Sequence, residues 1–370
     1  MKTIIVSATA LATSGALTIL NEFIDYISSL KKYKFIMFVP QGIQFPEADN
    51  ICYIAVAKKN WISRIYWDGF GLRKFIKKNK LDYIYTISLQ NTSINIRGNK
   101  IVYLHQSLPF VDLKIPATNI SNVKIWLYKQ FYSFFIFLFV DNSTSFIVQA
   151  KWLKKILSEK HKIKTDKIYV IKPKGGGVFT AEKASGYKDS VSSQKFNIIY
   201  PATPIFYKNH VVLIEAFNIL KARTDINDLV LNVTFHEGEH KMFDVLVKRY
   251  DLRECVHYLG YLTREQLYKK YEQSSLMVFP SYVETCGLPL LEGASMRLPV
   301  IASDLPYANE MLEGYDGVVF VKYDDPHEWA KEIEVFLQMK DSKKFEPLNM
   351  NGNESDWSKL VTIIEGRNNV

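Results

Sequence analysis

The sequence is poor in the residues that mark several classes of protein. Its 370 residues include only three cysteines, Cys52, Cys255 and Cys286, which lie far apart and form no C-x-x-C motif. It has 17 glycines and 13 prolines. These counts exclude a disulfide framework, a zinc knuckle and a collagen-like or low-complexity chain, and they favour a reducing compartment.

Long hydrophobic runs are also missing. The longest uncharged run in the aromatic stretch 126–140 is Gln130–Val140, well short of the roughly 20 residues that cross a bilayer. This stretch is expected to form a helix that is buried or lies at a membrane surface, with burial favoured. The apolar start of the chain is too short for a signal peptide, so Thr3–Ala8 is expected to be a first β-strand.

Several nucleotide and metal motifs are absent. There is no P-loop, no G-x-G-x-x-G after a strand, and no D-x-D where a nucleotide-bound Mg²⁺ would be expected, which argues against metal-dependent chemistry. The segment His236–His240 fits the H-E-x-x-H pattern of zinc proteases, but it follows an expected strand and contains Gly238. That pattern needs both histidines on one continuous helix, so a strand-to-helix turn is favoured over a zinc site.

Charge is distributed unevenly along the chain. Residues 1–180 carry 26 Lys and Arg against 10 Asp and Glu, a balance of +16, whereas residues 181–370 carry 21 against 28, a balance of −7. A basic half of this kind indicates an anionic partner, either nucleic acid or an anionic membrane surface.

Short β-branched or aromatic runs alternate with amphipathic stretches throughout the chain, which is typical of βαβ units in a doubly wound parallel sheet. A Gly- and Ser-rich stretch at 176–195 interrupts the pattern and is expected to be a linker. The sequence therefore predicts two α/β domains, 1–175 and 196–350. A last amphipathic segment within 351–370 is expected to form a helix that packs back on the first domain.

The most specific stretch is Phe279–Ala294, which combines an expected strand, a Pro-Ser turn and a glycine that opens a helix. Glu284 is expected in the loop at the carboxyl end of the strand, where ligands of doubly wound sheets bind. Glu292 is expected in the second turn of the helix, and the N–H groups at the helix start favour an anion. Two carboxylates beside a phosphate-binding helix end indicate a nucleotide-sugar site.

This stretch resembles the Glu-x7-Glu signature of retaining GT-B glycosyltransferases of the bacterial family 4 group. Other segments that resemble elements of the family are Val256–Leu262 with Glu265–Leu267, Leu298–Ser303, Tyr207–His210, Val148–Leu153 and His105–Phe110. The resemblance is strong over 196–310 and looser over 1–175. It implies a fold of two Rossmann-like doubly wound domains that face a cleft.

The resemblance also implies roles for individual residues. The expected catalytic residues are Glu284 at the donor sugar, Lys208 at the diphosphate and His105, which would reach the sugar from the first domain. The expected donor and nucleotide contacts are Glu292 at the ribose, Cys286, Gly287 and Leu288 at the diphosphate, Gly260 and Tyr261 at the base, and Gly15 in the first loop. The sequence departs from the family twice, because 202–206 contains no arginine and the usual Gly-Gly of the first loop is reduced to Ser14-Gly15. The diphosphate is therefore expected to depend more on Lys208 or on a substitute cation.

The implied activity is transfer of a sugar from a nucleotide-sugar donor with retention of configuration, without a metal or other cofactor. The implied acceptor is a saccharide on a polyprenyl diphosphate at the inner face of the cytoplasmic membrane, in synthesis of a surface polysaccharide such as O-antigen or capsule. This places the protein in the cytoplasm, peripherally bound to an anionic membrane. Two alternatives remain: a nucleotide-sugar epimerase with the same fold, and a basic nucleic-acid-binding protein, which the scattered lysines do not favour.

Overall fold

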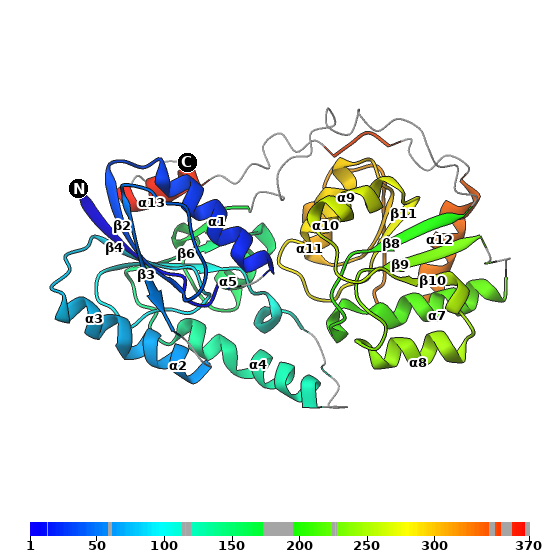
Figure 1. Cartoon of the computed structure of the whole chain (residues 1–370), viewed down its shortest axis with the longest axis horizontal. Helices are drawn as coiled ribbons and strands as arrows, with labels where there is room; N and C mark the ends of the chain where they lie inside the picture. Colours follow the sequence, from blue (N-terminus) through cyan, green and yellow to red (C-terminus); the bar gives the residue numbers. More distant parts are fainter. Residues whose placement is uncertain are drawn as a thin grey trace. The chain divides into compact units, whose positions relative to one another are not determined.

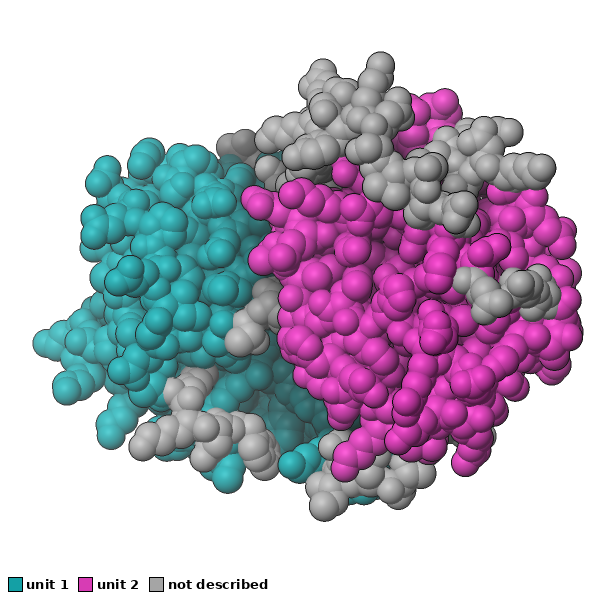
Figure 2. Space-filling view, turned by 45° about the vertical axis from the view of Figure 1, so that its right-hand side comes forward, with its two compact units in different colours: residues 1–176, 353–370 teal, residues 177–352 magenta. Residues whose placement is uncertain are grey.

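The computed structural model divides the chain into two compact units. Unit 1 comprises residues 1–176 and 353–370, and unit 2 comprises residues 177–352 (Figure 2). The structure describes residues 1–12, 14–57, 61–112, 115, 120–172, 195–223, 226, 228–339, 345–348 and 357–366. Apart from Lys195, the linker expected at 176–195 falls outside the described residues.

The described part of unit 1 contains a seven-stranded parallel sheet in the order β3-β2-β1-β4-β5-β6-β7 (Figure 1). The strands are β1 (Lys2–Ser7), β2 (Tyr33–Pro40), β3 (Ile51–Val56), β4 (Tyr85–Ser88), β5 (Asn99–Leu104), β6 (Thr144–Val148) and β7 (Ile168–Val170). Most are apolar on both faces, as expected for a parallel sheet covered on both sides by helices.

Helices cover both faces of this sheet. One face packs against α1 (Ser14–Ser28) and α13 (Ser358–Glu365). The other packs against α2 (Trp61–Tyr66), a π-helical turn (Trp67–Gly71), α3 (Leu72–Lys78), α4 (Ile120–Phe137) and α5 (Lys151–Glu159), with short 3-10 turns at Leu108–Phe110 and Thr165–Lys167. Neighbouring residues of β1 point to opposite faces. Ile4 packs with side chains of α1 and α13, and Ile5 packs with side chains of α3.

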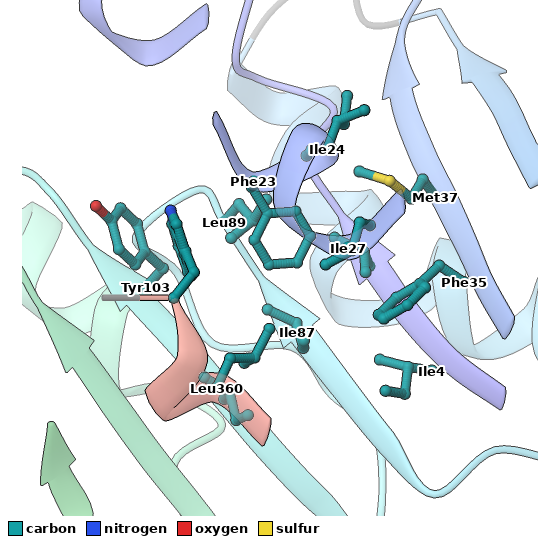
Figure 3. Close-up of a cluster of buried hydrophobic side chains, with 14 of the residues drawn as sticks. Ile4, Phe23, Ile24, Ile27, Phe35, Met37, Ile87, Leu89, Tyr103 and Leu360 are labelled. Atoms are coloured by element: carbon teal, nitrogen blue, oxygen red, sulfur yellow. The ribbon is translucent and has the colours of Figure 1, made fainter. Parts of the chain in front are cut away.

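The C-terminal helix α13 belongs to unit 1 although it follows unit 2 in the sequence. Figure 3 shows Leu360 of α13 in one cluster with Phe23 of α1 and Ile87 of β4. The ring of Trp357, just before α13, packs edge-on against Phe23 with centroids 5.1 Å apart. Burial of each such side chain contributes about 1.5–3 kcal/mol, which is enough to hold a short helix on the sheet.

The described part of unit 2 contains a six-stranded parallel sheet in the order β10-β9-β8-β11-β12-β13. Its strands are β8 (Phe196–Tyr200), β9 (Leu229–Val233), β10 (Val256–Tyr258), β11 (Leu276–Phe279), β12 (Val300–Ser303) and β13 (Val318–Val321). Its helices are α7 (His210–Lys221), α8 (Lys241–Arg249), α9 (Arg264–Glu272), α10 (Leu288–Ser295), α11 (Pro306–Met311) and α12 (Pro326–Gln338), with 3-10 turns at Phe206–Lys208 and Arg253–Cys255. The two doubly wound parallel sheets predicted from the sequence are confirmed.

Three local features differ from the sequence prediction. The helical segment Trp61–Lys78 has a π-helical turn, Trp67–Gly71, in its middle, which the amphipathic pattern does not predict. Residues 126–137 of the aromatic stretch belong to a helix that begins earlier, at Ile120, and ends at Phe137, and α11 was not predicted. Among the helices that the structure describes, none combines the length and the hydropathy needed to cross a membrane.

Candidate functional site

Lys208 and Glu284 form an ion pair at the carboxyl end of the second sheet. Lys208 ends the 3-10 turn after β8, and Glu284 lies in the loop after β11. The Lys208 Nζ donates a hydrogen bond to Glu284 Oε1, and only 16% and 15% of the two side chains are exposed. The hydroxyl of Tyr200 donates to the Lys208 carbonyl and fixes its backbone. A cation and a carboxylate are thus paired where a parallel sheet binds its ligands.

Asn209 holds the loops around this pair together. It has a left-handed backbone (φ 60°), a conformation that asparagine tolerates better than most residues. Its Nδ2 donates to the Tyr323 carbonyl at 2.6 Å and to the Pro280 carbonyl at 3.2 Å, and its Oδ1 accepts from the Tyr282 hydroxyl. The loops after β8, β11 and β13 are therefore linked through one buried side chain, which keeps Lys208 beside Glu284.

The loop that carries Glu284 leads directly into α10. Gly287 is the N-cap residue with φ 65°, and a Cβ there would lie 3.2 Å from Leu290 and 3.4 Å from Tyr307. The backbone conformation therefore favours glycine, and a Cβ would also require a small shift of Leu290. Cys286 is buried and Leu288 begins the helix, followed by Pro289. Pro289 has no N–H and the Leu290 N–H donates to the Gly287 carbonyl at 2.9 Å, so the N–H groups of Gly287 and Leu288 are the ones that this turn can offer to an anion.

Glu292 lies one turn into α10 and belongs to a second cluster. The Tyr271 hydroxyl of α9 donates to its Oε2 at 3.2 Å, and Arg264 Nη2 lies 3.8 Å from its Oε1. Burial raises the pKa of Glu292, while Arg264 and Tyr271 oppose that rise. Arg264 is placed by a capping box in which Thr263 and Gln266 satisfy each other's backbone N–H groups.

Gly260 and Tyr261, predicted to line a base pocket, lie against a histidine that the sequence analysis did not place there. Gly260 has φ 67°, and a Cβ on it would lie 2.5 Å from the ring of His236. The rings of His236 and Tyr261 stand edge-on with centroids 5.4 Å apart, and the Tyr261 hydroxyl donates to Glu239 at 2.8 Å. The rings of His236 and Tyr261 are exposed, and together with the Gly260 backbone they offer a surface on which a planar group can stack.

The H-E-x-x-H segment forms a turn between β9 and α8. His236 lies in the loop, Gly238 has φ 94°, and α8 begins only at Lys241. His240 caps that helix, with its Nδ1 accepting from the Phe243 N–H at 3.2 Å. Among the described residues, no group of three or more His, Cys, Asp or Glu side chains is placed to hold a metal ion.

Two predicted site residues belong to unit 1. Gly15 is the second residue of α1, which follows the loop after β1. His105 follows β5 and is held by Asn91, which follows β4. Burial and the nearby charge of Arg64 lower the pKa of His105 to about 4, so its ring is neutral at pH 7.

The structure thus brings Lys208 and Glu284 into contact, with the Gly287 turn three residues after Glu284 in the same loop. Glu292 lies with Arg264, and Gly260 lies with His236. Sequence reasoning missed the residues that connect these groups: Asn91, Asn209, His236, Arg264 and Tyr271. Only Asn209 carried a usable signal, because an asparagine directly before a helix is a common left-handed or capping residue.

The family described as glycosyl transferases group 1 matches residues 188–353, which include every site residue of unit 2. O-antigen chain mannosyltransferase RfbU of Salmonella typhimurium is 23% identical over 287 residues, covering 76% of this chain and 72% of that protein. O-antigen chain mannosyltransferase B of Escherichia coli is 30% identical over 105 residues, which are 28% of each chain.

Solved structures of similar fold cover both units. A glycosyltransferase from Rickettsia africae has a TM-score of 0.67 at 18% identity, covering 100% of this chain and 99% of that one. HepE from Anabaena, solved in complex with UDP-glucose, has a TM-score of 0.63 at 13% identity and covers 99% of both chains. The chain thus has the GT-B fold of these glycosyltransferases, with two Rossmann-like units, and its second unit is similar to the group 1 glycosyltransferases.

Proposed function

We propose that the protein transfers a sugar from a nucleotide-sugar donor to a saccharide acceptor, with retention of anomeric configuration and without a metal. The observation that carries the proposal is the Lys208–Glu284 pair in unit 2, with the loop of Glu284 leading into α10. A cation and a helix N-terminus are the two devices by which proteins bind a diphosphate without a metal. A carboxylate beside them suits the hydroxyls of the sugar that the diphosphate carries.

In the proposed reaction, the bond between the anomeric carbon and the diphosphate oxygen breaks and negative charge develops on the leaving diphosphate. Lys208 and the first N–H groups of α10 stabilise that charge where it forms. The acceptor hydroxyl attacks from the face that the diphosphate leaves, and its proton passes to the departing phosphate. Glu284 orients the sugar and stabilises positive charge at the anomeric carbon. Glu292 holds the ribose, and His236 with Tyr261 faces the base.

The names of the relatives support a surface polysaccharide as the product. RfbU and mannosyltransferase B are named for the O-antigen chain, and HepE was solved with UDP-glucose. We therefore propose an acceptor saccharide that grows on a lipid carrier, as such chains do when they are built at a membrane. Donors to test first are GDP-mannose, UDP-glucose and UDP-N-acetylglucosamine.

The surface of unit 1 supports contact with an anionic membrane. Exposed apolar residues repeat every three or four positions on the helical segment 61–71 and along α4, so each helix presents one apolar side. These residues, here called the apolar stripe, are Ile62, Tyr66, Phe70, Val123, Trp126, Leu127, Phe131, Phe134 and Leu138. The two helices are neighbours (Figure 1), because Arg64 of α2 donates to the Tyr132 hydroxyl of α4 at 3.0 Å.

Exposed lysines accompany the apolar stripe. Lys124 lies on α4, and Lys74, Lys77 and Lys78 follow on α3. Each lysine close to an anionic leaflet contributes about 1 kcal/mol, and exposed aromatic side chains insert at the headgroup level. Together they support reversible binding to the inner face of the cytoplasmic membrane, where a lipid-linked acceptor is presented.

A donor panel tests the transfer reaction. The protein is incubated with the three nucleotide sugars and a polyprenyl-diphosphate-linked saccharide in the presence of EDTA, and products are identified by mass spectrometry and by the anomeric proton coupling in NMR. The proposal predicts one extended saccharide that keeps the anomeric configuration of its donor. Inversion would refute the retaining mechanism, and an epimerised nucleotide sugar without transfer would favour the epimerase alternative.

A further inference from the structure

Asn91 has a fixed orientation beside His105 in unit 1. Its backbone is left-handed (φ 68°) and it is buried. Its Oδ1 accepts two backbone N–H groups, from His105 at 2.7 Å and from Gln106 at 2.9 Å. A side-chain NH₂ in that position would face two donors, so the amide can have only one orientation.

This orientation determines the protonation of the neighbouring ring. With Oδ1 engaged, the Nδ2 of Asn91 is the atom that lies 3.1 Å from Nε2 of His105. An amide nitrogen donates and does not accept, so Nε2 must be the accepting nitrogen. In a neutral imidazole the proton then lies on Nδ1.

The surroundings of His105 favour the neutral ring. It is half-buried beside the ring of Tyr103, with centroids 5.9 Å apart, and the guanidinium of Arg64 from α2 is the nearby charge that disfavours an imidazolium. Arg64 is itself held by the Gln90 carbonyl, the Tyr132 hydroxyl and the carboxylate of Asp68, whose side chain is nearly buried. Asp68 is engaged by Gln90 at 2.6 Å and by Thr92 at 2.7 Å.

We propose that Asn91 is a positioning residue that holds His105 as the neutral Nδ1–H tautomer, so that His105 takes part in sugar transfer as a neutral hydrogen-bonding group and not as a cation. The proposal rests on the proposed function for the role of His105, whereas the tautomer is a property of the protein without substrate.

The tautomer is measured by long-range proton–nitrogen NMR of the full chain labelled with ¹⁵N-histidine at pH 7, with His105→Gln identifying the signal. The expected spectrum has a protonated Nδ1 and an unprotonated Nε2. In Asn91→Asp, the carboxylate still accepts the two backbone N–H groups, but its second oxygen faces Nε2 and requires a proton there. The Nε2 signal is therefore expected to become the protonated one.

Asn95→Asp is the matched control, because Asn95 is an asparagine of the same loop region whose Nδ2 donates to the Gly69 carbonyl at 3.0 Å. It is expected to leave the His105 signals unchanged. An Nε2–H tautomer or an imidazolium in the wild type would overturn the proposal even if Asn91→Asp does not fold, and so would an unchanged tautomer in folded Asn91→Asp. Asn91→Asp is also expected to lower kcat about tenfold with donor KM within about twofold, the loss of one oriented hydrogen bond. If the wild type transfers no sugar, the proposed function is refuted. The tautomer is decided separately, because the NMR measurement needs no substrate.

Discussion

In each unit the first strand lies between the second and the fourth: β1 between β2 and β4, and β8 between β9 and β11. This is the point where the direction of winding reverses and where loops of doubly wound sheets leave room for ligands. In unit 1 the loops there carry mainly neutral polar groups, and the Thr9 hydroxyl bonds Gln90 at 2.9 Å. In unit 2 they carry the Lys208–Glu284 pair and lead into α10. At this edge the charges of unit 1, Arg64 and Asp68, come from a neighbouring helical segment and contact each other and the loop, whereas in unit 2 the loops themselves carry the charged pair, here called the charged edge, which suits the diphosphate.

The outer surfaces of the units differ in a second way. Large hydrophobic side chains gather on two neighbouring helices in unit 1, as the apolar stripe. In the described part of unit 2, the exposed ones are separated over α8, the loop after β10 and the end of α12: Met242, Val245, Tyr261, Val335 and Met339. The basic excess of residues 1–180 coincides with the stripe. From this comparison we propose that unit 2 binds the donor and that unit 1 contacts the membrane.

The largest expected effect follows from breaking the charged edge of unit 2. Glu284→Gln and Lys208→Met are each expected to lower kcat by about 100-fold or more, because both act where charge develops. Circular dichroism should change little, whereas the melting temperature should fall, because each change removes one partner of a largely buried ion pair. Lys221→Met is the control: it breaks the partly exposed pair with Asp251 at the far end of α7 and should cost less than about twofold. Wild-type turnover in Glu284→Gln would refute the site.

Substitutions at Glu292 and Arg264 are expected to have a smaller effect, mainly on donor binding and less on the catalytic rate. Glu292→Gln is expected to raise the donor KM about tenfold through a lost charged hydrogen bond, with a smaller change in kcat. Burial raises the pKa of Glu292 and Arg264 opposes that rise, so Arg264→Gln lets the pKa rise further. The carboxylate then ionises only at higher pH, and donor affinity should fall more at pH 5.5 than at pH 7.5.

Arg253→Gln provides the control for this pH dependence, because Arg253 is an exposed arginine in the turn before β10. Its ratio of donor KM at the two pH values should equal that of the wild type. The same ratio in Arg264→Gln would contradict the role given to Arg264.

The membrane assignment of unit 1 is tested by removing part of the apolar stripe. Phe131→Ser with Phe134→Ser is expected to lower partition onto anionic vesicles about tenfold at low salt, because each exposed ring loses its burial in the interface. Met242→Ser with Val245→Ser removes two exposed apolar side chains from unit 2 and should leave partition unchanged. High salt should release the wild type. Equal binding to neutral vesicles would contradict an electrostatic contribution.

The smallest expected effect is that of a chelator. Lys208 and the α10 turn are proposed to neutralise the diphosphate, so EDTA should change the transfer rate by less than about twofold. Initial rates with and without EDTA, followed by addition of Mg²⁺, Mn²⁺ or Zn²⁺, measure this. Complete loss of activity in EDTA, with rescue by one of these ions, would show that a metal ion neutralises the diphosphate and would contradict the role proposed for Lys208.

Much of the fold followed from local patterns. The alternation of short apolar runs and amphipathic stretches predicted the two parallel sheets, and the structure has both. A strand that is buried on both faces is apolar whichever elements pack against it, so it can be recognised from its own residues. The π-helical turn Trp67–Gly71 was not predicted, because it places the carboxylate of Asp68 against Gln90 and Thr92 of the loop after β4, which are 22 and 24 residues away in the sequence.

Glu284 was predictable from its place in the loop after a strand, whereas the role of Lys208 was implied by the resemblance to the family. Their direct pairing was not predicted, since it depends on Asn209 joining three loops. The sequence gives no sign that Arg264, at the start of a helix, has a role in the site. The role follows from the structure, in which its Nη2 lies 3.8 Å from Glu292 Oε1. Asn91 gave no signal, because its role depends on a contact with a different loop.

The division of labour between the units is tested most directly by the binding of nucleoside diphosphates and monophosphates, measured by calorimetry on the full chain. The wild type is expected to bind the diphosphate at least about tenfold more tightly than the monophosphate, as one charge-assisted contact provides. Lys208→Met should lose that preference, whereas Asn91→Asp in unit 1 should keep it. A wild type without the preference, or a Lys208→Met variant that retains it, would contradict the assignment of the donor diphosphate to the charged edge of unit 2.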